Sequence, residues 1–175
     1  MSIDLNNVLD SSSSIEDTCL NLIVGKSDST DGSFLIHNFL SNSIRQTNQA
    51  NNNNNNNNNS KIFFITFAQT LSHFKSVQSK LGNSAHLNNL IQSKRFIHFD
   101  AGTNLTNVYL NETEKSDEQN LTLLNEIWNS IKENLNSSLD NSNTKSVVII
   151  DDLSIASLIG IADRALYEFI LKLVN

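Results

Sequence analysis

Charged residues are scarce in this chain, at 17% of its 175 residues, and positive charge is the scarcer sign. The net charge is −6, so the broad basic face of a stand-alone nucleic-acid-binding protein is missing. The nearest substitute is a thin scatter of cations: Lys75, Lys80, Lys94 and Arg95. We interpret these residues as a solvated surface that would contact RNA only with charge supplied by partners.

Long apolar runs are also missing, and none approaches the roughly 18–20 residues that cross a bilayer. The start of the chain has neither the basic residues nor the apolar core of a signal peptide. We therefore expect a cytoplasmic protein, with the nucleus as a second compartment, and no membrane partner. The single cysteine, Cys19, excludes an intramolecular disulfide, and we predict that it is a small buried residue beside a strand.

Asparagine and serine supply most of the polar residues in place of charged ones. An unbroken Asn run from Asn51 to Asn59 lies inside a longer polar stretch from Gln46 to Ser60. Such a tract cannot bury apolar area, so we predict a disordered loop insertion at about 46–60. Loop length costs little free energy, so the insertion does not divide the chain. We predict a single domain over residues 1–175.

Four short apolar runs predict buried strands, and each is followed by a predicted helix. The strands are placed at 20–24, 62–67, 96–99 and 147–150, and the helices at 33 to about 45, 71–81 with Gly82 at its C-terminal end, 121–135 and 162–173. This alternation predicts an α/β fold, a parallel sheet with helices on both faces. Four strands are few for this class, so we expect a C-terminally truncated chain or a partner over an open edge.

Ligands of open parallel sheets bind at the carboxyl ends of the strands. Two segments of this sequence fall there, the loop from Gly25 to Ser33 and the pair Asp151 and Asp152. Their order is that of the phosphate loop and the magnesium-binding aspartate of P-loop NTPases. The sequence therefore predicts a P-loop NTPase-type frame, that is, the sheet, the loop after the first strand and the strand-end aspartates in the order of that class.

The loop does not match the phosphate-binding pattern G-x-x-x-x-G-K-[ST] in any register. Read from Gly25, Asp31 stands where the lysine is needed. Read back from Ser33, Gly32 stands in that position. In the third register, residues 25–27 form the tail of the motif, and the loop would coincide with the strand itself.

Charge also opposes a nucleotide here, because Asp28 and Asp31 lie in the same loop. A like charge at about 4 Å costs on the order of 4 kcal/mol at an effective dielectric constant near 20. We therefore expect no bound cofactor, no metal and no catalytic residue. The expected remnants are Gly25, Gly32 and Ser33 of a phosphate loop, and Asp151 and Asp152 of a Walker B-like strand end.

A plain structural interpretation of the two aspartates is also open, since Asp often caps the turn after a strand. The four histidines, His37, His73, His86 and His98, are spread over different predicted elements. We interpret each as a surface or packing residue. Spacing alone indicates no pair of nucleophile and base.

Three stretches resemble subunit 6 of the Elongator complex: Thr30–Leu40 (TDGSFLIHNFL), Phe67–Gly82 (FAQTLSHFKSVQSKLG) and Val147–Ile155 (VVIIDDLSI). The resemblance implies a RecA-like fold with a degenerate phosphate loop. It also implies a non-catalytic structural subunit that joins subunits four and five in a hetero-hexameric ring. That ring docks on the catalytic Elongator subcomplex, binds tRNA and supports modification of the wobble uridine. Family members continue beyond the equivalent of Asn175 and lack the Asn tract.

Two other functions remain open from the residues alone. One is a small NTPase with an atypical phosphate loop that uses Lys26, and the other is a stand-alone regulatory α/β module that binds magnesium at Asp151 and Asp152. An arginine that reaches a neighbour's phosphates is a further possibility in a ring. The sequence does not choose among the three arginines: Arg45, Arg95 and Arg164.

Overall fold

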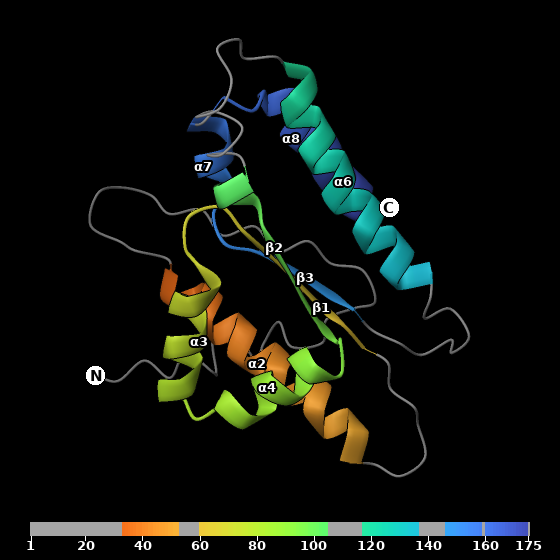
Figure 1. Ribbon diagram of the computed structural model, residues 1–175. Helices are drawn as coiled ribbons and strands as arrows, with labels where there is room; N and C mark the ends of the chain where they lie inside the picture. The colour runs from red at the N-terminus through yellow and green to blue at the C-terminus, as the bar shows by residue number, and fades with distance from the viewer. Residues whose placement is uncertain (1–32, 53–59, 105–116, 137–145, 159, 175) are drawn as a thin grey trace.

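The computed structural model describes residues 33–52, 60–104, 117–136, 146–158 and 160–174, and it places a parallel sheet between two layers of helices (Figure 1). Strand β1 (Ile62–Thr66) lies in the centre, between β2 (Phe96–Asp100) and β3 (Val147–Ile150). Three of the four predicted strands, and the α/β class, are thereby confirmed. The fourth predicted strand, at 20–24, lies outside the described residues.

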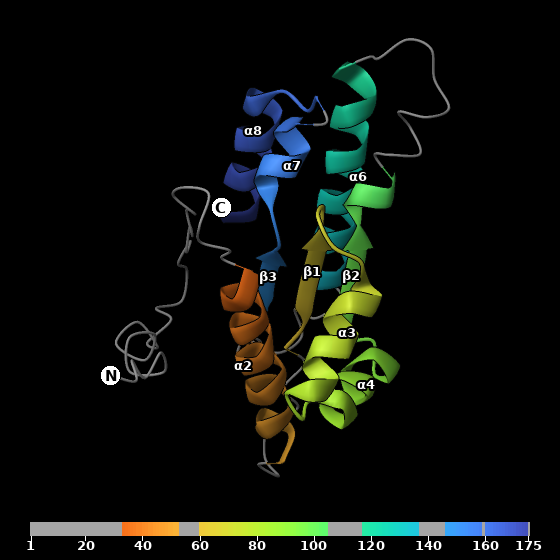
Figure 2. The same cartoon turned by 90° about the vertical axis from the view of Figure 1, so that its left-hand side faces the viewer.

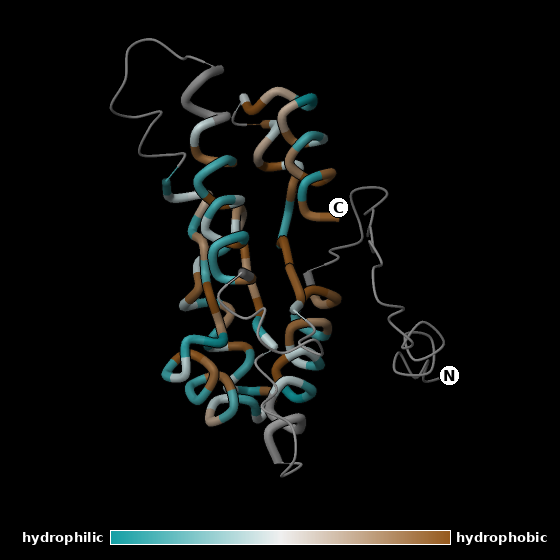
Figure 3. Tube along the Cα trace, turned by 90° about the vertical axis from the view of Figure 1, so that its right-hand side faces the viewer, coloured by the Kyte–Doolittle hydropathy of each residue, from teal (hydrophilic) through white to brown (hydrophobic). Residues whose placement is uncertain are grey.

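All five residues of β1 are buried, and the side chains of the first four alternate between two separate clusters. Phe63 and Ile65 belong to one cluster, and Ile62 and Phe64 belong to the other. Both faces of the sheet are therefore covered, which is why the first four residues of β1 form an unbroken apolar run and do not alternate with polar residues (Figure 3 colours the chain by hydropathy).

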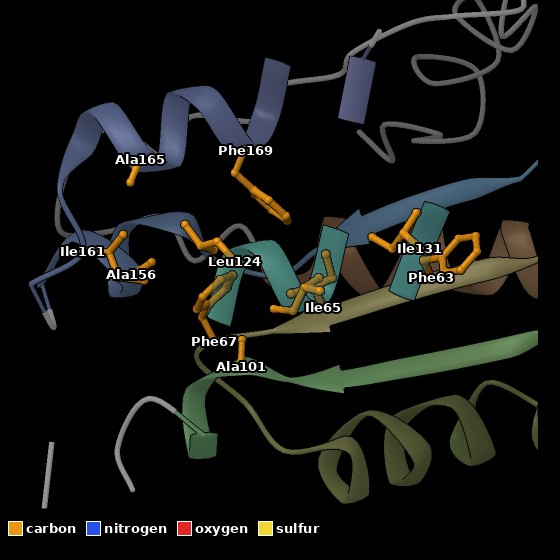
Figure 4. Packing of buried hydrophobic residues seen from close by; sticks show 11 residues of the cluster. Phe63, Ile65, Phe67, Ala101, Leu124, Ile131, Ala156, Ile161, Ala165 and Phe169 are labelled. Atoms are coloured by element: carbon orange, nitrogen blue, oxygen red, sulfur yellow. The ribbon is translucent and has the colours of Figure 1, made fainter. Parts of the chain in front are cut away.

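The helices divide between the two faces (Figure 2). One face carries α2 (Ser33–Asn52), α3 (Leu71–Lys80) and α4 (Ser84–Gln92), and the other carries α6 (Asp117–Asn136), α7 (Leu153–Leu158) and α8 (Asp163–Val174). In the second layer, the cluster of Phe63 and Ile65 also contains Leu124 and Ile131 of α6 and Phe169 of α8 (Figure 4). Full burial of one such side chain contributes about 1.5–3 kcal/mol.

Three helices differ from the sequence prediction, and one of them is the short helix α7, which is not among the four predicted helices. Helix α4 was not predicted, because its nine residues bury only Leu87 and Leu90 and are otherwise mostly small and polar. Helix α2 ends at Asn52, about seven residues later than predicted, so any loop insertion begins later than residue 46. The rest of the Asn tract, 53–59, lies outside the described residues, and the loop remains a prediction.

Helix α3 ends as its sequence predicts, at a glycine. Gly82 has a φ of 78°, in the left-handed region that favours glycine. Its N–H donates to the Ser79 carbonyl at 3.1 Å, and the Asn83 N–H donates to the Gln78 carbonyl at 2.9 Å. This pair of bonds is a Schellman motif, and it turns the chain directly into α4.

A buried polar network holds α2 against the corner between α3 and α4. The Gln78 side chain is fully buried and donates to the backbone carbonyl of His37 at 3.0 Å. The Asn83 amide group donates to Gln78 Oε1 at 2.8 Å and to Ser41 Oγ, while its Oδ1 accepts from Arg45 at 3.0 Å. Buried amides with their hydrogen bonds satisfied restrict a helix to one position, because any shift leaves a buried polar group unpaired.

Arg95 corrects the interpretation of the scattered cations as solvated surface. Its side chain is 8% exposed, and burial lowers the pKa of its guanidinium group. The guanidinium donates to the Thr47 carbonyl at 2.8 Å and to the Ser60 carbonyl at 3.1 Å. These two carbonyls stand on either side of the Asn tract. One buried arginine therefore joins the end of α2 to the start of β1.

Replacing Arg95 with alanine should lower the free energy of unfolding by about 2–3 kcal/mol, because two charge-assisted hydrogen bonds are lost inside the protein. Chemical denaturation of the purified chain measures this change. The matched control is Lys94→Ala, which removes a neighbouring exposed cation and should change the stability by less than about 0.5 kcal/mol. Equal losses for the two variants would contradict a structural role for Arg95.

Candidate functional site

The candidate site is the sheet edge where the strands end. Thr66 of β1 is in register with Asp100 of β2, and Ile65 of β1 is in register with Ile150 of β3, so the three ends lie side by side. Asp151 and Asp152 directly follow β3, which is the predicted location. Of the predicted phosphate-loop remnants, Ser33 is the first residue of α2. Gly25 and Gly32 lie outside the described residues.

The Asp151 carboxylate binds the backbone that follows β1. Its Oδ1 accepts from the N–H of Phe67 at 2.7 Å and from that of Asp152 at 2.6 Å. Its Oδ2 accepts from the N–H groups of Ala68 and Gln69, both at 3.1 Å. Successive backbone N–H groups that converge on one point form a binding site for an anion. Here the anion is the protein's own side chain.

The two carboxylate oxygens have about four lone-pair positions in all, and the four backbone N–H donors occupy them. Burial raises the pKa of Asp151, and the four backbone N–H groups lower it by less. A magnesium ion would have to displace backbone donors and would meet a carboxyl group that ionises less readily. The Asp151 carboxylate therefore stabilises the loop after β1. Among the described residues, no three His, Cys, Asp or Glu side chains are grouped to hold a metal.

Asp152 directly precedes helix α7 and caps its first turn. Its Oδ1 accepts from the Ser154 N–H at 2.9 Å and from the Ser154 hydroxyl at 2.6 Å, at the start of α7. A side-chain oxygen that accepts from this position is an N-cap. The interpretation of a strand-end aspartate as the cap of the next turn is thus confirmed for Asp152, whereas Asp151 binds the segment that follows the neighbouring strand β1.

The turn after β2 lies directly against the loop after β1. Gly102 lies so close to the Phe67 carbonyl that a Cβ atom there would overlap the carbonyl oxygen. Asp100 accepts from the Thr103 N–H at 2.9 Å, which closes the turn after β2. Each strand end is therefore bound to protein backbone. Sequence patterns could not show this arrangement, because Asp151 and Phe67 are 84 residues apart.

A pairing that the sequence did not indicate lies within the sheet. Thr66 Oγ1 and His98 Nε2 are 2.9 Å apart, at a hydrogen-bonding distance that nucleophiles and bases share in enzymes. Thr66 is only 1% exposed, however, so its hydroxyl cannot meet a substrate. Burial lowers the pKa of His98, which favours the neutral ring. The pair is therefore a buried contact between β1 and β2.

The other histidines and the arginines lie away from this edge or have structural contacts. His37 is buried, with its ring centroid 4.8 Å from that of Phe74. This confirms a packing role for His37. Arg45 belongs to the polar network of α2. Arg164 pairs with Glu168 on α8, with 89% of its side chain exposed.

The fold and the site define an α/β protein with a parallel sheet between helical layers, in which the strand-end acid stabilises the protein's own backbone. A family model described as Elongation complex protein 6 matches residues 3–173, so the chain belongs to this family. The family consists of Elongator complex subunits, which implies a role in tRNA modification. No curated protein and no solved structure matches the chain. None of the described helices could span a membrane.

Replacing Asp151 with alanine should destabilise the chain by about 2 kcal/mol, because the buried N–H of Phe67 and its two neighbours lose their acceptor. Asp152→Ala removes the adjacent acid and one helix cap, and should cost about 1 kcal/mol or less. Denaturation curves with and without millimolar magnesium distinguish the two roles. Stabilisation of the wild type by magnesium that Asp151→Ala abolishes would contradict the structural role and support a metal site.

Proposed function

We propose that this chain is a non-catalytic structural subunit of Elongator with a RecA-like fold, and that it forms a hetero-hexameric ring with subunits four and five. In this proposal the ring docks on the catalytic subcomplex, binds tRNA and supports modification of the wobble uridine. The chain itself binds no nucleotide, and the predicted phosphate-loop positions Gly25, Gly32 and Ser33 are remnants. The family match over residues 3–173 supports the assignment to Elongator.

The observation that carries the non-catalytic part is the environment of Asp151. In a P-loop NTPase, the corresponding aspartate helps to hold magnesium beside the phosphates. Here four backbone N–H groups already bind its carboxylate. A chain that uses this residue to fix its own loop keeps the NTPase-type frame as a scaffold. The same contact argues against a magnesium-dependent regulatory module at Asp151 and Asp152.

Helix α8 supports a role in assembly. Its inner side packs Ala165 and Phe169 into the core, while Tyr167, Leu171 and Val174 on its outer side are 64%, 41% and 42% exposed. The spacing of these three residues, at i, i+4 and i+7, places them in one row along the helix. Rows of exposed large apolar residues are typical of protein–protein contacts. We assign this row to a contact with a neighbouring subunit of the ring.

Contact with tRNA would need charge from several subunits. Lys75 and Lys80 are exposed on α3, and Lys94 is exposed beyond α4. Arg95 is buried and cannot contribute. Three exposed lysines on a chain of net charge −6 form a weak basic surface. Binding of tRNA is therefore assigned to the assembled ring and not to this chain alone.

Co-expression with subunits four and five tests the assembly directly. We expect the three chains to purify together through gel filtration in equal amounts, with tRNA bound by the complex and not by the isolated chain. Absence of this chain from the complex under mild conditions would contradict the proposal. Micromolar ATP binding by the isolated chain, lost in Lys26→Ala, would favour the NTPase alternative.

The row on α8 can be tested with a single charge. Tyr167→Glu places a carboxylate in the proposed contact and should weaken co-purification at least about tenfold, because a desolvated charge costs more than about 1.4 kcal/mol. Asn129→Glu adds the same charge on an exposed position of α6 and should leave assembly unchanged. Circular dichroism of both variants checks that each remains folded. Equal effects of the two substitutions would remove α8 from the interface.

A further inference from the structure

Charge is divided unevenly along this chain, although its net charge is −6. Residues 33–99 contain no aspartate and no glutamate, whereas an even spread of the 18 acidic residues would place about seven of them there. The same stretch holds six of the 12 lysines and arginines. Residues 100–175, by contrast, hold 12 acidic residues and five basic ones. The net charge of the whole chain therefore conceals a basic stretch of +6 and an acidic stretch of −7.

The fold separates the two stretches in space. Helices α2, α3 and α4 come from the acid-free stretch and cover one face of the sheet, whereas α6, α7 and α8 come from the acidic stretch and form the acidic layer on the other face (Figure 2). Two cations of the acid-free stretch are engaged inside the protein: Arg95 is buried, and Lys61 donates to the Asn134 carbonyl of α6 at 2.6 Å. The other four are exposed: Arg45, Lys75, Lys80 and Lys94.

Three of the exposed cations lie around α4, at the end of the sheet where the strands begin. Helix α3 starts beside the end of β1 and runs back along the sheet, so its last residue, Lys80, lies far from Asp151. Arg45 of α2 reaches the same corner, where its Nη2 donates to the Leu81 carbonyl at 3.4 Å. Lys94 lies at the other end of α4, whose nine residues span about 13–14 Å. We call these three cations and the exposed side of α4 the α4 surface.

Between its cations the α4 surface is polar and neutral. The exposed residues of α4 are Ser84, Ala85, His86, Asn88, Asn89 and Gln92. Between residues 71 and 95, Leu81 is the only large hydrophobic side chain that is exposed. The centre of a protein–protein contact is apolar and aromatic, whereas nucleic-acid interfaces are polar and positively charged, with many hydrogen bonds to phosphate from Lys, Arg, Ser, Asn and Gln. The α4 surface therefore fits a phosphate backbone better than it fits a protein.

The backbone of Lys94 is an independent sign that this surface has a function. Its φ is 56°, in the left-handed region. The Lys94 N–H donates to the Ile91 carbonyl at 3.1 Å, and the Arg95 N–H donates to the Leu90 carbonyl at 2.8 Å, which is the Schellman pair that ends α3 at Gly82. This position favours glycine, because a residue with a Cβ atom is strained there, and such strain is concentrated at functional sites. A lysine in place of glycine is explained if its charge is needed.

We propose that the α4 surface binds the phosphate backbone of RNA through Arg45, Lys80 and Lys94. The inference rests on the proposed function for the identity of this RNA as tRNA, and it locates the contribution of this chain. One phosphate contact raises the affinity about fourfold at about 0.15 M salt relative to 1 M, because log K falls by about 0.7 per tenfold rise in salt. Three contacts then supply only about 60-fold, so the other subunits of the ring must supply the remaining contacts.

The test measures the tRNA affinity of the complex with subunits four and five at several salt concentrations. Lys80→Gln and Lys94→Gly should each lower the affinity about fourfold at about 0.15 M salt and reduce the slope of log K against log salt by about 0.7–0.9. Lys132→Gln removes an exposed lysine from α6 in the acidic layer and should change neither quantity. Lys94→Gly should also raise the folding equilibrium constant about two- to fivefold, because glycine relieves the left-handed strain. Misfolding cannot explain weaker binding by a more stable variant.

The outcomes separate this inference from the proposed function. If the complex assembles and binds tRNA, but Lys80→Gln and Lys94→Gly bind it like the wild type, the α4 surface is overturned and the proposed function stands. If the two variants lose co-purification, the surface contacts an acidic protein, which also overturns the inference. If the three chains do not assemble, the proposed function fails, and oligo-uridine binding by the full-length chain at low salt decides. Weaker binding by the two variants than by Lys132→Gln supports the α4 surface, and equal binding overturns it.

Discussion

The hydrogen bonds of the Asp151 carboxylate determine the arrangement of the sheet edge. They connect the end of β3 to the segment after β1, and this segment leads into α3. The position of α3 in turn sets the Gly82 turn, and with it the place of α4. One half-buried carboxylate thus links two strands and one helical layer. Its desolvation is unfavourable, and the four N–H groups offset part of that cost because they are already oriented in the folded chain.

Elsewhere among the described residues, neutral amides and two arginines, Arg45 and Arg95, hold helix α2 in place. The Gln78 and Asn83 amides hold α2, and the Arg95 guanidinium group binds backbone carbonyls at both sides of the Asn tract. Only 17% of the residues are charged, so ion pairs are a minor source of specificity here. Buried amide networks tolerate little displacement, since each lost hydrogen bond leaves a desolvated group. An Asn-rich composition is therefore compatible with a well-defined helical layer.

The sequence predicted those parts of the fold that depend on local apolar pattern. The runs at Ile62, Phe96 and Val147 are dense enough to identify strands, and Gly82 identifies a helix end. It could not predict α4, whose two buried leucines are too few to set a period. It also missed the burial of Arg95, because the carbonyls that bind it are 35 and 48 residues away. Long-range polar contacts leave no periodic signal.

For the site, the sequence located Asp151 and Asp152 correctly at the end of a strand, but it left their role open between a metal remnant and a structural cap. The geometry favours the cap, because a metal ligand needs free lone pairs and those of Asp151 are occupied. A strand-end aspartate has the same local sequence in both cases. What differs is the backbone of the neighbouring strand, which turns its N–H groups toward the carboxylate here. In the proposed structural subunit, the Asp151 carboxylate joins the end of β3 to the segment after β1 through hydrogen bonds within the chain itself.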